Sequence, residues 1–413
     1  MSKAALPRLR WVMIGLAFLA TLINYLDRQT LSVAAPLLRD EFQISNVGYA
    51  RIVFAFMLAY TVMNGASGPL LDRLGTRVGY ALCMLWWSAA AFLHAFSTGI
   101  WSLATYRFLL GMGEAGNWPA AVKLVSEWFP PHERAMASGI FNSGSAVGAI
   151  LSPPLIAWII LRSGWRHAFY AVGIAGFLWL ILWMCLYRKP TEATPREKQA
   201  TIPVGQLIRN RFVVVFTLSK VFVDPVWYFY IFWFPEYLKR VRHFDMASIG
   251  KYAWIPFLAA GFGNLLGGWV SAALLRRNFS LSTARKLSVT VFVLLMTAAI
   301  PAVLAPSPWM SIVWVSVAMI GYTGSLANML AFPADVFPTS AVGSVYGIAS
   351  MGSGFGGMVF SLLTGWTIDH YSYTPVFIGF GVMPLVCAGI LWTLLGPISK
   401  LSAGRNLEHN YGQ

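Results

Sequence analysis

The chain contains little charge and little cysteine. Of its 413 residues, 11% are charged and 57% are hydrophobic, whereas a soluble globular domain has about 25% charged residues. This composition excludes an ordinary soluble protein and indicates a membrane protein. Cys83, Cys185 and Cys387 stand singly in different apolar segments without C-x-x-C spacing. They therefore predict neither a disulfide framework nor a metal site.

Signatures of catalysis are missing as well. The six histidines are scattered over loops, tails and the ends of apolar segments, so they form no metal or haem ligand cluster. The sequence has neither a G-x-S-x-G nucleophile elbow nor a phosphate-binding glycine loop. We therefore expect a protein that is not an enzyme.

Long apolar segments dominate the sequence. A helix needs about 20 apolar residues to cross a bilayer, and twelve segments meet this at 11–35, 47–70, 78–97, 101–123, 135–160, 167–187, 211–235, 248–274, 285–305, 309–332, 342–365 and 373–396. The basic start of the chain resembles a signal peptide, but no small-residue cleavage site follows it, so we expect the first span to be retained. The sequence predicts an all-α membrane protein with twelve transmembrane helices.

Positive charge is concentrated in alternate loops. Nineteen Lys and Arg residues lie in the two tails and in the loops on their side, against eight in the opposite loops. The net charge of +15 would suggest a nucleic-acid partner for a soluble protein, but this distribution is that of a topology signal. We therefore expect an inner-membrane protein with both termini in the cytoplasm and no nucleic-acid partner.

Two segments repeat one another at an offset of 208 residues. The pattern is an acid-x-Phe-Pro motif followed by three glycines, found at Glu127–Pro130 with Gly139, Gly144 and Gly148, and again at Asp335–Pro338 with Gly347, Gly352 and Gly356. Such a duplication is typical of transporters, whose substrate sites lie near the bilayer midplane at the interface of the repeats. It predicts two six-helix halves, 1–187 and 211–413, joined by a cytoplasmic linker at 188–210, with a short cytoplasmic tail at the end.

Three predicted spans contain ionisable residues, each of which costs about 2.5–3.5 kcal/mol on insertion scales. Three cations accompany three anions, so we expect mutual neutralisation: Asp27 and Arg28, Arg107 and Glu114, and Lys220 and Asp224. Arg107 and Glu114 are seven residues apart and so share one helix face. The role of the i,i+4 pair Lys220 and Asp224 stays open between a functional and a structural one. The pair precedes Pro225, where a helix would be broken, and could simply brace that break.

The charged residues of the first and fourth spans have two interpretations. They could form structural salt bridges, or they could bind an anionic substrate and protons. Arg28 and Arg107 carry planar forks suited to holding an anionic substrate. A low-dielectric cavity favours the protonated form of a carboxylate, whereas a nearby arginine favours the charged form. Asp27 and Glu114 can therefore exchange protons as substrate binds and leaves. These residues predict proton-coupled anion uptake, with protons as the coupling ion and no metal or other cofactor.

Several aromatic and polar residues are candidates for contact with a hydroxylated substrate. They are Tyr25, Tyr60, Trp118, Trp227 and Tyr228 together with Asn142, Asn328 and Ser350. Each of these residues could equally serve helix packing or hydrogen bonds between helices.

The loop after the second span carries a specific signature. Gly68-Pro69-Leu70-Leu71-Asp72-Arg73-Leu74-Gly75-Thr76-Arg77 resembles the G-x-x-x-D-R-x-G-x-R loop of the major facilitator superfamily. The corresponding loop of the second half has Gly268 and Arg276-Arg277 but lacks the acid. The resemblance implies rocker-switch alternating access, and it implies that Gly68, Asp72, Arg73, Gly75 and Arg77 form a cytoplasmic conformational latch.

Motifs along nearly the whole chain are similar to those of the anion:cation symporter family. They are Asn24-Tyr25-Leu26-Asp27-Arg28, Arg107 through Gly113-Glu114-Ala115-Gly116, and Glu133-Arg134 with Gly139 to Gly144. The segments 220–227, 335–338 and 341–345 look most like those of bacterial hexuronate transporters, which implies inward carriage of glucuronate or galacturonate with protons. Tyr322-Thr323 departs from the His-Gln pair typical of such relatives, so the sugar acid stays open.

Taken together, the sequence predicts a monomeric secondary transporter in the lipid bilayer that imports a small sugar-acid anion, a hexuronate, by proton symport. Two alternatives stay open. The first is uniport or exchange of another organic anion, such as an aldonate or an aldarate. The second is a receptor that binds the anion without moving it, although a sensor would normally carry an output domain for which the chain has no room.

Overall fold

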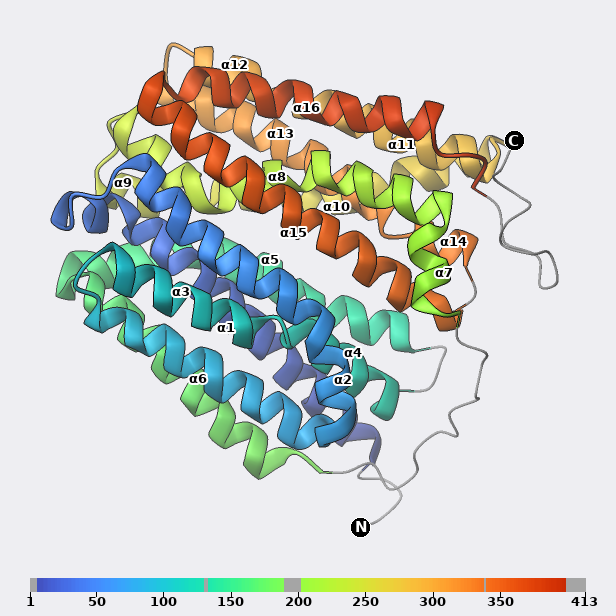
Figure 1. Cartoon of the computed structure of the whole chain (residues 1–413), viewed down its shortest axis with the longest axis horizontal. Coiled ribbons are helices and arrows are strands. Elements are labelled where there is room, and N and C mark those ends of the chain that lie inside the picture. Colours follow the sequence, from blue (N-terminus) through green and yellow to red (C-terminus); the bar gives the residue numbers. More distant parts are fainter. Residues whose placement is uncertain (1–5, 130–132, 189–201, 338, 399–413) are drawn as a thin grey trace. The chain divides into compact units, whose positions relative to one another are not determined.

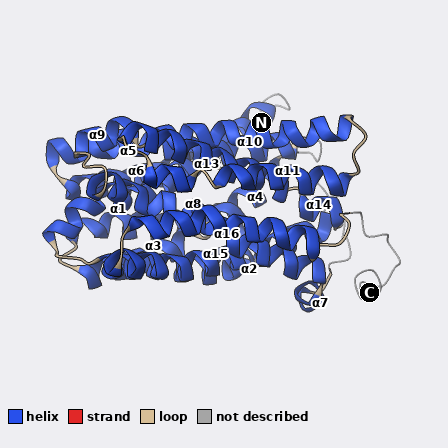
Figure 2. Cartoon of the chain, turned by 90° about the horizontal axis from the view of Figure 1, so that it is seen from above, coloured by secondary structure: helices blue, strands red, loops and turns tan. Residues whose placement is uncertain are grey.

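The computed structural model describes residues 6–129, 133–188, 202–337 and 339–398, and all regular structure in these ranges is helical (Figures 1 and 2). The α-helices are α1 (Leu6–Glu41), α2 (Asn46–Leu93), α3 (Ile100–Glu114), α4 (Asn117–Trp128), α5 (Arg134–Ser163), α6 (Trp165–Leu186), α7 (Val204–Arg209), α8 (Arg211–Arg240), α9 (Met246–Tyr252), α10 (Ile255–Arg276), α11 (Leu281–Met296), α12 (Ala299–Leu304), α13 (Pro308–Met329), α14 (Phe332–Val336), α15 (Thr339–His370) and α16 (Tyr373–Thr393). A short 3-10 helix, His94–Phe96, follows α2.

Eleven stretches of helix in the described part of the chain are long and apolar enough to cross a membrane. The predicted span at 101–123 is not among them, because two shorter helices, α3 and α4, replace it on either side of Ala115 and Gly116. The other eleven predicted spans each coincide with one of these stretches. The predicted all-helical membrane fold is confirmed, and the predicted fourth span is divided into α3 and α4 by an irregular turn whose backbone stays in the right-handed helical region.

Helix ends follow local side-chain chemistry. The hydroxyls of Ser45, Ser280 and Ser307 accept hydrogen bonds from main-chain N–H groups in the first turns of α2, α11 and α13, which satisfies donors that the helix itself cannot pair. Within α2, the chain turns at Gly75, whose φ of 75° is left-handed. Only glycine adopts this conformation at little cost, and the turn separates the second span from the third.

Contacts divide the described residues into two compact units. Unit 1 consists of those in Met1–Glu197 and Phe232–Trp254, and unit 2 of those in Lys198–Ile231 and Ile255–Gln413. Helix α8 therefore contributes its first part to unit 2 and its last nine residues, Phe232–Arg240, to unit 1. Most of the predicted linker at 188–210 lies outside the described residues. The predicted halves stay a prediction, because contacts report how the chain packs and not where a duplication begins.

Corresponding glycines of the repeat pack helices closely within each unit. In unit 1, a Cβ added to Gly148 of α5 would come within 2.7 Å of the carbonyl oxygen of Leu22 of α1. In unit 2, a Cβ on Gly356 of α15 would come within 2.5 Å of the carbonyl oxygen of Val221 of α8. Figure 1 shows α1 and α5 side by side. The second and third glycines of each copy thus serve helix packing, as small residues do in membranes, whereas Gly139 and Gly347 meet nothing within 4 Å.

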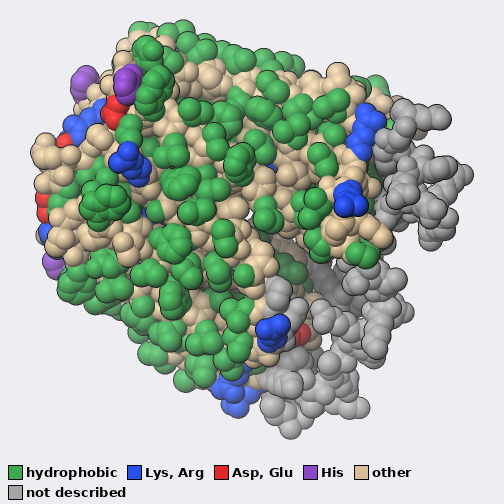
Figure 3. All heavy atoms as spheres, viewed as in Figure 1, with side chains coloured by type: hydrophobic (Ala, Val, Ile, Leu, Met, Phe, Trp, Pro, Cys, Tyr) green, Lys and Arg blue, Asp and Glu red, His purple; other side chains and the backbone are tan. Residues whose placement is uncertain are grey.

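Apolar side chains cover much of the outer surface. Large hydrophobic residues are exposed along most of the long helices, for example Leu182, Leu265 and Trp269. Green hydrophobic side chains dominate the face drawn in Figure 3, where few charged side chains are visible. Such a surface suits contact with lipid, which cannot hydrate charged groups.

Candidate functional site

Four charged side chains meet in the interior of unit 1. Asp27 and Arg28 come from the middle of α1, while Arg107 and Glu114 come from α3, one face and two turns apart. None of the four is more than 5% exposed. Glu114 is the last residue of α3, directly before the irregular turn at Ala115 and Gly116 that joins α3 to α4. Ionisable groups buried in membrane helices usually mark a substrate or ion pathway.

Arg28 and Glu114 form an ion pair. The Nε of Arg28 donates to Oε2 of Glu114 over 2.6 Å, and both side chains are buried. The predicted neutralisation of span charges is thus realised between α1 and α3, which are 86 residues apart at this pair. A charge-assisted bond of this length in a buried place is strong. It engages one oxygen of the Glu114 carboxylate and the Nε of Arg28, while Oε1 of Glu114 and Nη2 of Arg28 have no hydrogen-bond partner among the described residues.

Arg107 and Asp27 are left with unused bonding capacity. Arg107 donates from Nη2 to the main-chain oxygen of Asp27 over 3.4 Å, while its Nε and Nη1 have no hydrogen-bond partner among the described residues. Neither carboxylate oxygen of Asp27 has one within the same part of the chain. Buried polar atoms are normally paired. An arginine fork and a carboxylate without partners are therefore the groups available to bind an anion and a proton.

Aromatic rings surround the Arg28 guanidinium. Its Cζ lies 4.4 Å from the ring centroid of Tyr60, 5.5 Å from that of Tyr25 and 6.0 Å from that of Trp118. All three were candidates from the sequence. The ring of Phe56 on α2 lies 5.4 Å from Arg28 and 5.9 Å from Arg107. Attraction to these rings steadies both cations and leaves the polar edge of the guanidinium for a ligand.

In unit 2, the pair Lys220 and Asp224 joins an aromatic cluster. Nζ of Lys220 lies 2.7 Å from Oδ2 of Asp224, and both side chains are almost fully buried. The hydroxyl of Tyr322 donates to Oδ1 of Asp224 over 3.3 Å. The ring of Trp227 stacks on Tyr322 with centroids 5.1 Å apart and planes inclined by 15°. Tyr322 thus lies against the charged pair.

The three predicted polar contacts differ in their surroundings. Asn328 is fully buried, and its amide donates to the main-chain oxygens of Gly267 and Gly324 over 2.9 and 3.1 Å, so it bridges α10 and α13. Asn142 of α5 is exposed and Ser350 of α15 is half-buried. No hydrogen bond among the described residues joins Asn142 to the charged cluster of unit 1. The roles of these three residues stay predictions.

The signature loop is tied to the repeat motif of the first half. Thr76 donates to Oε1 of Glu127 over 2.7 Å, and Arg77 donates to the main-chain oxygen of Met184 over 3.0 Å. Gly68 is half-buried in α2, Arg73 is exposed and Gly75 makes the turn, while the side chain of Asp72 lies outside what the structure describes. The latch role stays a prediction.

The second copy of the acid-x-Phe-Pro motif is tied down in the same way. Asp335, which corresponds to Glu127, accepts from Nε of Arg285 over 2.8 Å. Arg285 corresponds to Arg77 at the same offset of 208 residues and also donates to Ser271 over 3.1 Å. Each unit therefore anchors the acid of its motif to a polar residue at the start of a neighbouring helix, which supports the duplication.

Sequence reasoning missed two groups. Phe56 carries no signal, because 15% of the residues are aromatic and its position says nothing about which helix it faces. Glu236 was not identified because it falls one residue past the predicted seventh span. The structure buries it completely and pairs it with Arg39, which the sequence assigns to a loop. The available signal in the sequence was that Glu236 directly follows Pro235 at the end of an apolar segment.

Comparison with known proteins identifies the family of the chain. The family model of the Major Facilitator Superfamily matches residues 17–284 and 280–409. The chain belongs to the major facilitator superfamily. The hexuronate transporter of Escherichia coli strain K12 is 33% identical to it over 407 residues, which is 94% of each chain. The D-galactonate transporter of Escherichia coli strain CFT073 is 30% identical over 430 residues, covering 97% of this chain and 99% of that protein.

A solved structure shares the fold of this superfamily member. The crystal structure of a D-xylose-proton symporter superposes with a TM-score of 0.77 at 14% identity, covering 94% of this chain and 98% of that one. The predicted resemblance to the superfamily and to hexuronate transporters is confirmed. The chain is a multi-pass membrane transporter, and the prediction that it is not an enzyme is confirmed by the same comparisons.

Proposed function

We propose that the chain imports a sugar-acid anion, a hexuronate, across the inner membrane by proton symport with alternating access. The observation that carries this proposal is the buried group of unit 1, in which an Arg28–Glu114 ion pair lies near Arg107 and Asp27. Among the described residues, Nε and Nη1 of Arg107 and both carboxylate oxygens of Asp27 have no hydrogen-bond partner. The hexuronate relative supports the substrate class. The positive-inside pattern supports an orientation with both termini in the cytoplasm.

The geometry suggests how proton and anion binding are coupled. While Glu114 is charged, it occupies Arg28. Transfer of a proton to Glu114 removes the ionic part of this bond, so Arg28 becomes free for the carboxylate of the substrate. Arg107 offers Nε and Nη1 to the same anion. Asp27 accepts a second or alternative proton, because both of its oxygens are unpaired.

Charge balance favours this order of events. The net charge of the buried cluster is zero when both of its arginines and both of its carboxylates are ionised. A neutral cluster has the lowest desolvation free energy in a low-dielectric interior. A monovalent anion that enters with one proton preserves this neutrality, whereas an anion alone leaves a net negative charge. Symport therefore requires less desolvation free energy than uniport through the same residues.

The test is uptake of labelled glucuronate and galacturonate into proteoliposomes, with and without an inward proton gradient. We expect accumulation above equilibrium only with the gradient. Asp27→Asn and Glu114→Gln are expected to abolish this accumulation while substrate exchange persists. Unchanged accumulation in both variants refutes the assignment of these carboxylates. Equilibration that ignores the gradient in the parent protein indicates a uniporter or exchanger instead.

The sugar acid itself is tested by competition. The D-galactonate relative is nearly as similar in sequence as the hexuronate relative, so aldonates are the alternative with a specific observation behind it. Excess unlabelled galacturonate, galactonate and galactarate are compared as inhibitors of glucuronate uptake. Stronger inhibition by galactonate than by either hexuronate replaces the hexuronate proposal with an aldonate.

A further inference from the structure

The turn after Glu114 lacks one main-chain hydrogen bond of a regular helix. Pro119 of α4 has no N–H and cannot donate to the carbonyl of Ala115, four residues earlier. Ser67 of α2 donates its hydroxyl to that carbonyl instead, over 3.4 Å. The position of the turn, and with it that of Glu114, therefore depends on side-chain contacts with neighbouring helices.

Asn117, the first residue of α4, links the turn to two of these helices. Its amide nitrogen donates to the hydroxyl of Thr21 of α1 over 3.2 Å, and its amide oxygen accepts from the hydroxyl of Tyr80 of α2 over 2.7 Å. All three side chains are completely buried. Since the two partners are uncharged, neither a proton nor an anion competes for these bonds.

Glycines let α2 pack directly against the same turn. A Cβ added to Gly116 would come within 2.3 Å of Sγ of Cys83 of α2, and a Cβ added to Gly113 would come within 2.8 Å of the main-chain nitrogen of Trp87 of α2. The turn therefore has no room to move towards α2, while Asn117 binds it to α1.

The Arg28–Glu114 pair uses only one of the two bonds that its groups offer. Nε of Arg28 donates to Oε2 of Glu114 over 2.6 Å, whereas Nη2 of Arg28 and Oε1 of Glu114 have no hydrogen-bond partner in the part of the chain that the structure describes. Arginine and carboxylate groups frequently form two parallel bonds, and buried polar atoms are normally paired. Since both atoms of the second bond are present and unused, a restraint keeps the carboxylate from forming it.

We propose that Asn117 is a positioning residue for Glu114. By binding the turn to Thr21 and Tyr80, it holds the carboxylate in a single bond with Arg28. The pair then stays weak enough for a substrate anion to displace it, and Oε1 stays available to a proton. This rests on the proposed function, because Asn117 acts only through a carboxylate that takes up a proton and competes with the anion.

The experiment measures glucuronate affinity after the contacts of Asn117 are removed, in the parent protein and in Glu114→Gln. Asn117→Leu replaces the amide by an apolar group of similar size. Thr21→Val removes one hydroxyl and keeps the shape of the side chain, so it serves as the second variant should Asn117→Leu fold poorly. The dissociation constant is obtained from tryptophan fluorescence of the full chain in lipid nanodiscs, titrated with glucuronate.

In the parent background we expect both substitutions to weaken glucuronate binding, by about ten-fold for Asn117→Leu, since a second charge-assisted bond from Arg28 to Glu114 contributes that order to an equilibrium constant. In Glu114→Gln we expect the same substitutions to change the affinity by less than about two-fold, which is the usual limit of additivity, because no carboxylate is left to form the second bond. A purely structural role for Asn117 weakens binding equally in both backgrounds.

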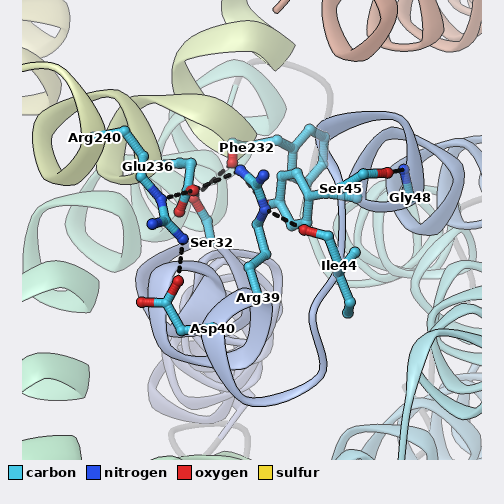
Figure 4. Close-up of polar contacts among 10 residues, drawn as sticks. Ser32, Arg39, Asp40, Ile44, Ser45, Gly48, Phe232, Glu236 and Arg240 are labelled. Atoms are coloured by element: carbon cyan, nitrogen blue, oxygen red, sulfur yellow. Dashed lines mark hydrogen bonds and ion pairs between the residues drawn. The ribbon is translucent and has the colours of Figure 1, made fainter. Parts of the chain in front are cut away.

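The matched control is Ser32→Ala. Ser32 lies on the same helix as Thr21, one turn after Arg28, and donates its completely buried hydroxyl to the main-chain oxygen of Phe232 over 3.2 Å (Figure 4). The control therefore removes a buried hydroxyl from α1 without a contact to the turn, and it should bind glucuronate as the parent does.

Thermal unfolding without substrate tests the positioning role independently of the proposed function. Glu114→Gln should lower the unfolding temperature more in the Asn117→Leu protein than in the parent, because it then breaks a stronger pair.

The proposal is overturned by an equal loss of affinity in the two backgrounds, by unchanged or tighter glucuronate binding in the parent background, or by an equal effect of Ser32→Ala. An equal or smaller drop in unfolding temperature also overturns it. If no variant binds glucuronate, a larger drop in unfolding temperature supports the positioning role and refutes only the proposed substrate.

Discussion

Replacing Glu114 by glutamine separates the two roles that the structure suggests for this residue. Glu114 stabilises the empty protein by pairing with Arg28 over 2.6 Å, and by the same bond it competes with an anionic substrate. Loss of one partner of a buried ion pair costs about 3–5 kcal/mol, because the other charge is left uncompensated. We therefore expect the unliganded Glu114→Gln variant to unfold at a lower temperature than the parent.

Substrate affinity should change in the opposite direction. A hydrogen bond to a charged group contributes about 1.5–3 kcal/mol, and a factor of ten in affinity corresponds to about 1.4 kcal/mol. Freed from Glu114, Arg28 should bind a hexuronate about ten- to a hundred-fold more tightly. The anion then supplies the missing counter-charge, so substrate should raise the unfolding temperature more in the variant than in the parent.

The assay is titration of the purified protein with glucuronate, followed by tryptophan fluorescence, together with thermal unfolding in the presence and absence of substrate. Glu41→Gln is the control, because Glu41 pairs with Arg166 at the surface. Equal or weaker binding of glucuronate in Glu114→Gln refutes the idea that Glu114 competes with substrate for Arg28, and the ion pair is then purely structural.

Three further outcomes are expected, each measured by thermal unfolding. Gly75→Ala should destabilise the protein by about 1–3 kcal/mol, since the backbone at this turn has φ 75° and ψ 160°, a region that residues with a Cβ occupy only under strain. Gly148→Val should cost about 1–3 kcal/mol through overpacking against α1, whereas Gly139→Ala on the same helix meets nothing within 4 Å and should be neutral. Hydrogen bonds from Ser248, first from its side chain and then from its main chain, lower the pKa of Asp245, which caps α9. The stability that the charge of Asp245 contributes is therefore present above its unfolded pKa of about 4 and is lost as pH falls through the lower folded value, so Asp245→Ala should be less stable than the parent at pH 7, by a margin that shrinks in strong acid.

Much of the fold could be predicted because the membrane restricts what a sequence can do. Continuous apolar runs of about 20 residues are long enough to cross lipid as helices, in which each segment satisfies its main-chain hydrogen bonds by itself. Charges within those runs are costly, so Asp27, Arg28, Arg107 and Glu114 were recognisable as a group before any contact was known. The offset of 208 residues identified glycines that then proved to pack helices in both units.

The irregular turn at Ala115 and Gly116 was not predictable in the same way. The apolar pattern continues through it, and the neighbouring glycines are equally compatible with close packing of a regular helix. The turn directly follows Glu114, whose carboxylate pairs with Arg28.

The sequence by itself determined the membrane class, the apolar spans, the duplicated motif and the set of charged residues. The reason is that the free energy of inserting a segment into lipid depends on the composition of that segment alone. Only the tertiary structure decided which charges meet. Arg28 pairs with Glu114 across 86 residues, and Arg39 with Glu236 across 197. These partners depend on how each helix is rotated about its axis and on which neighbour it packs against, and both are set by side-chain packing between segments far apart in the chain.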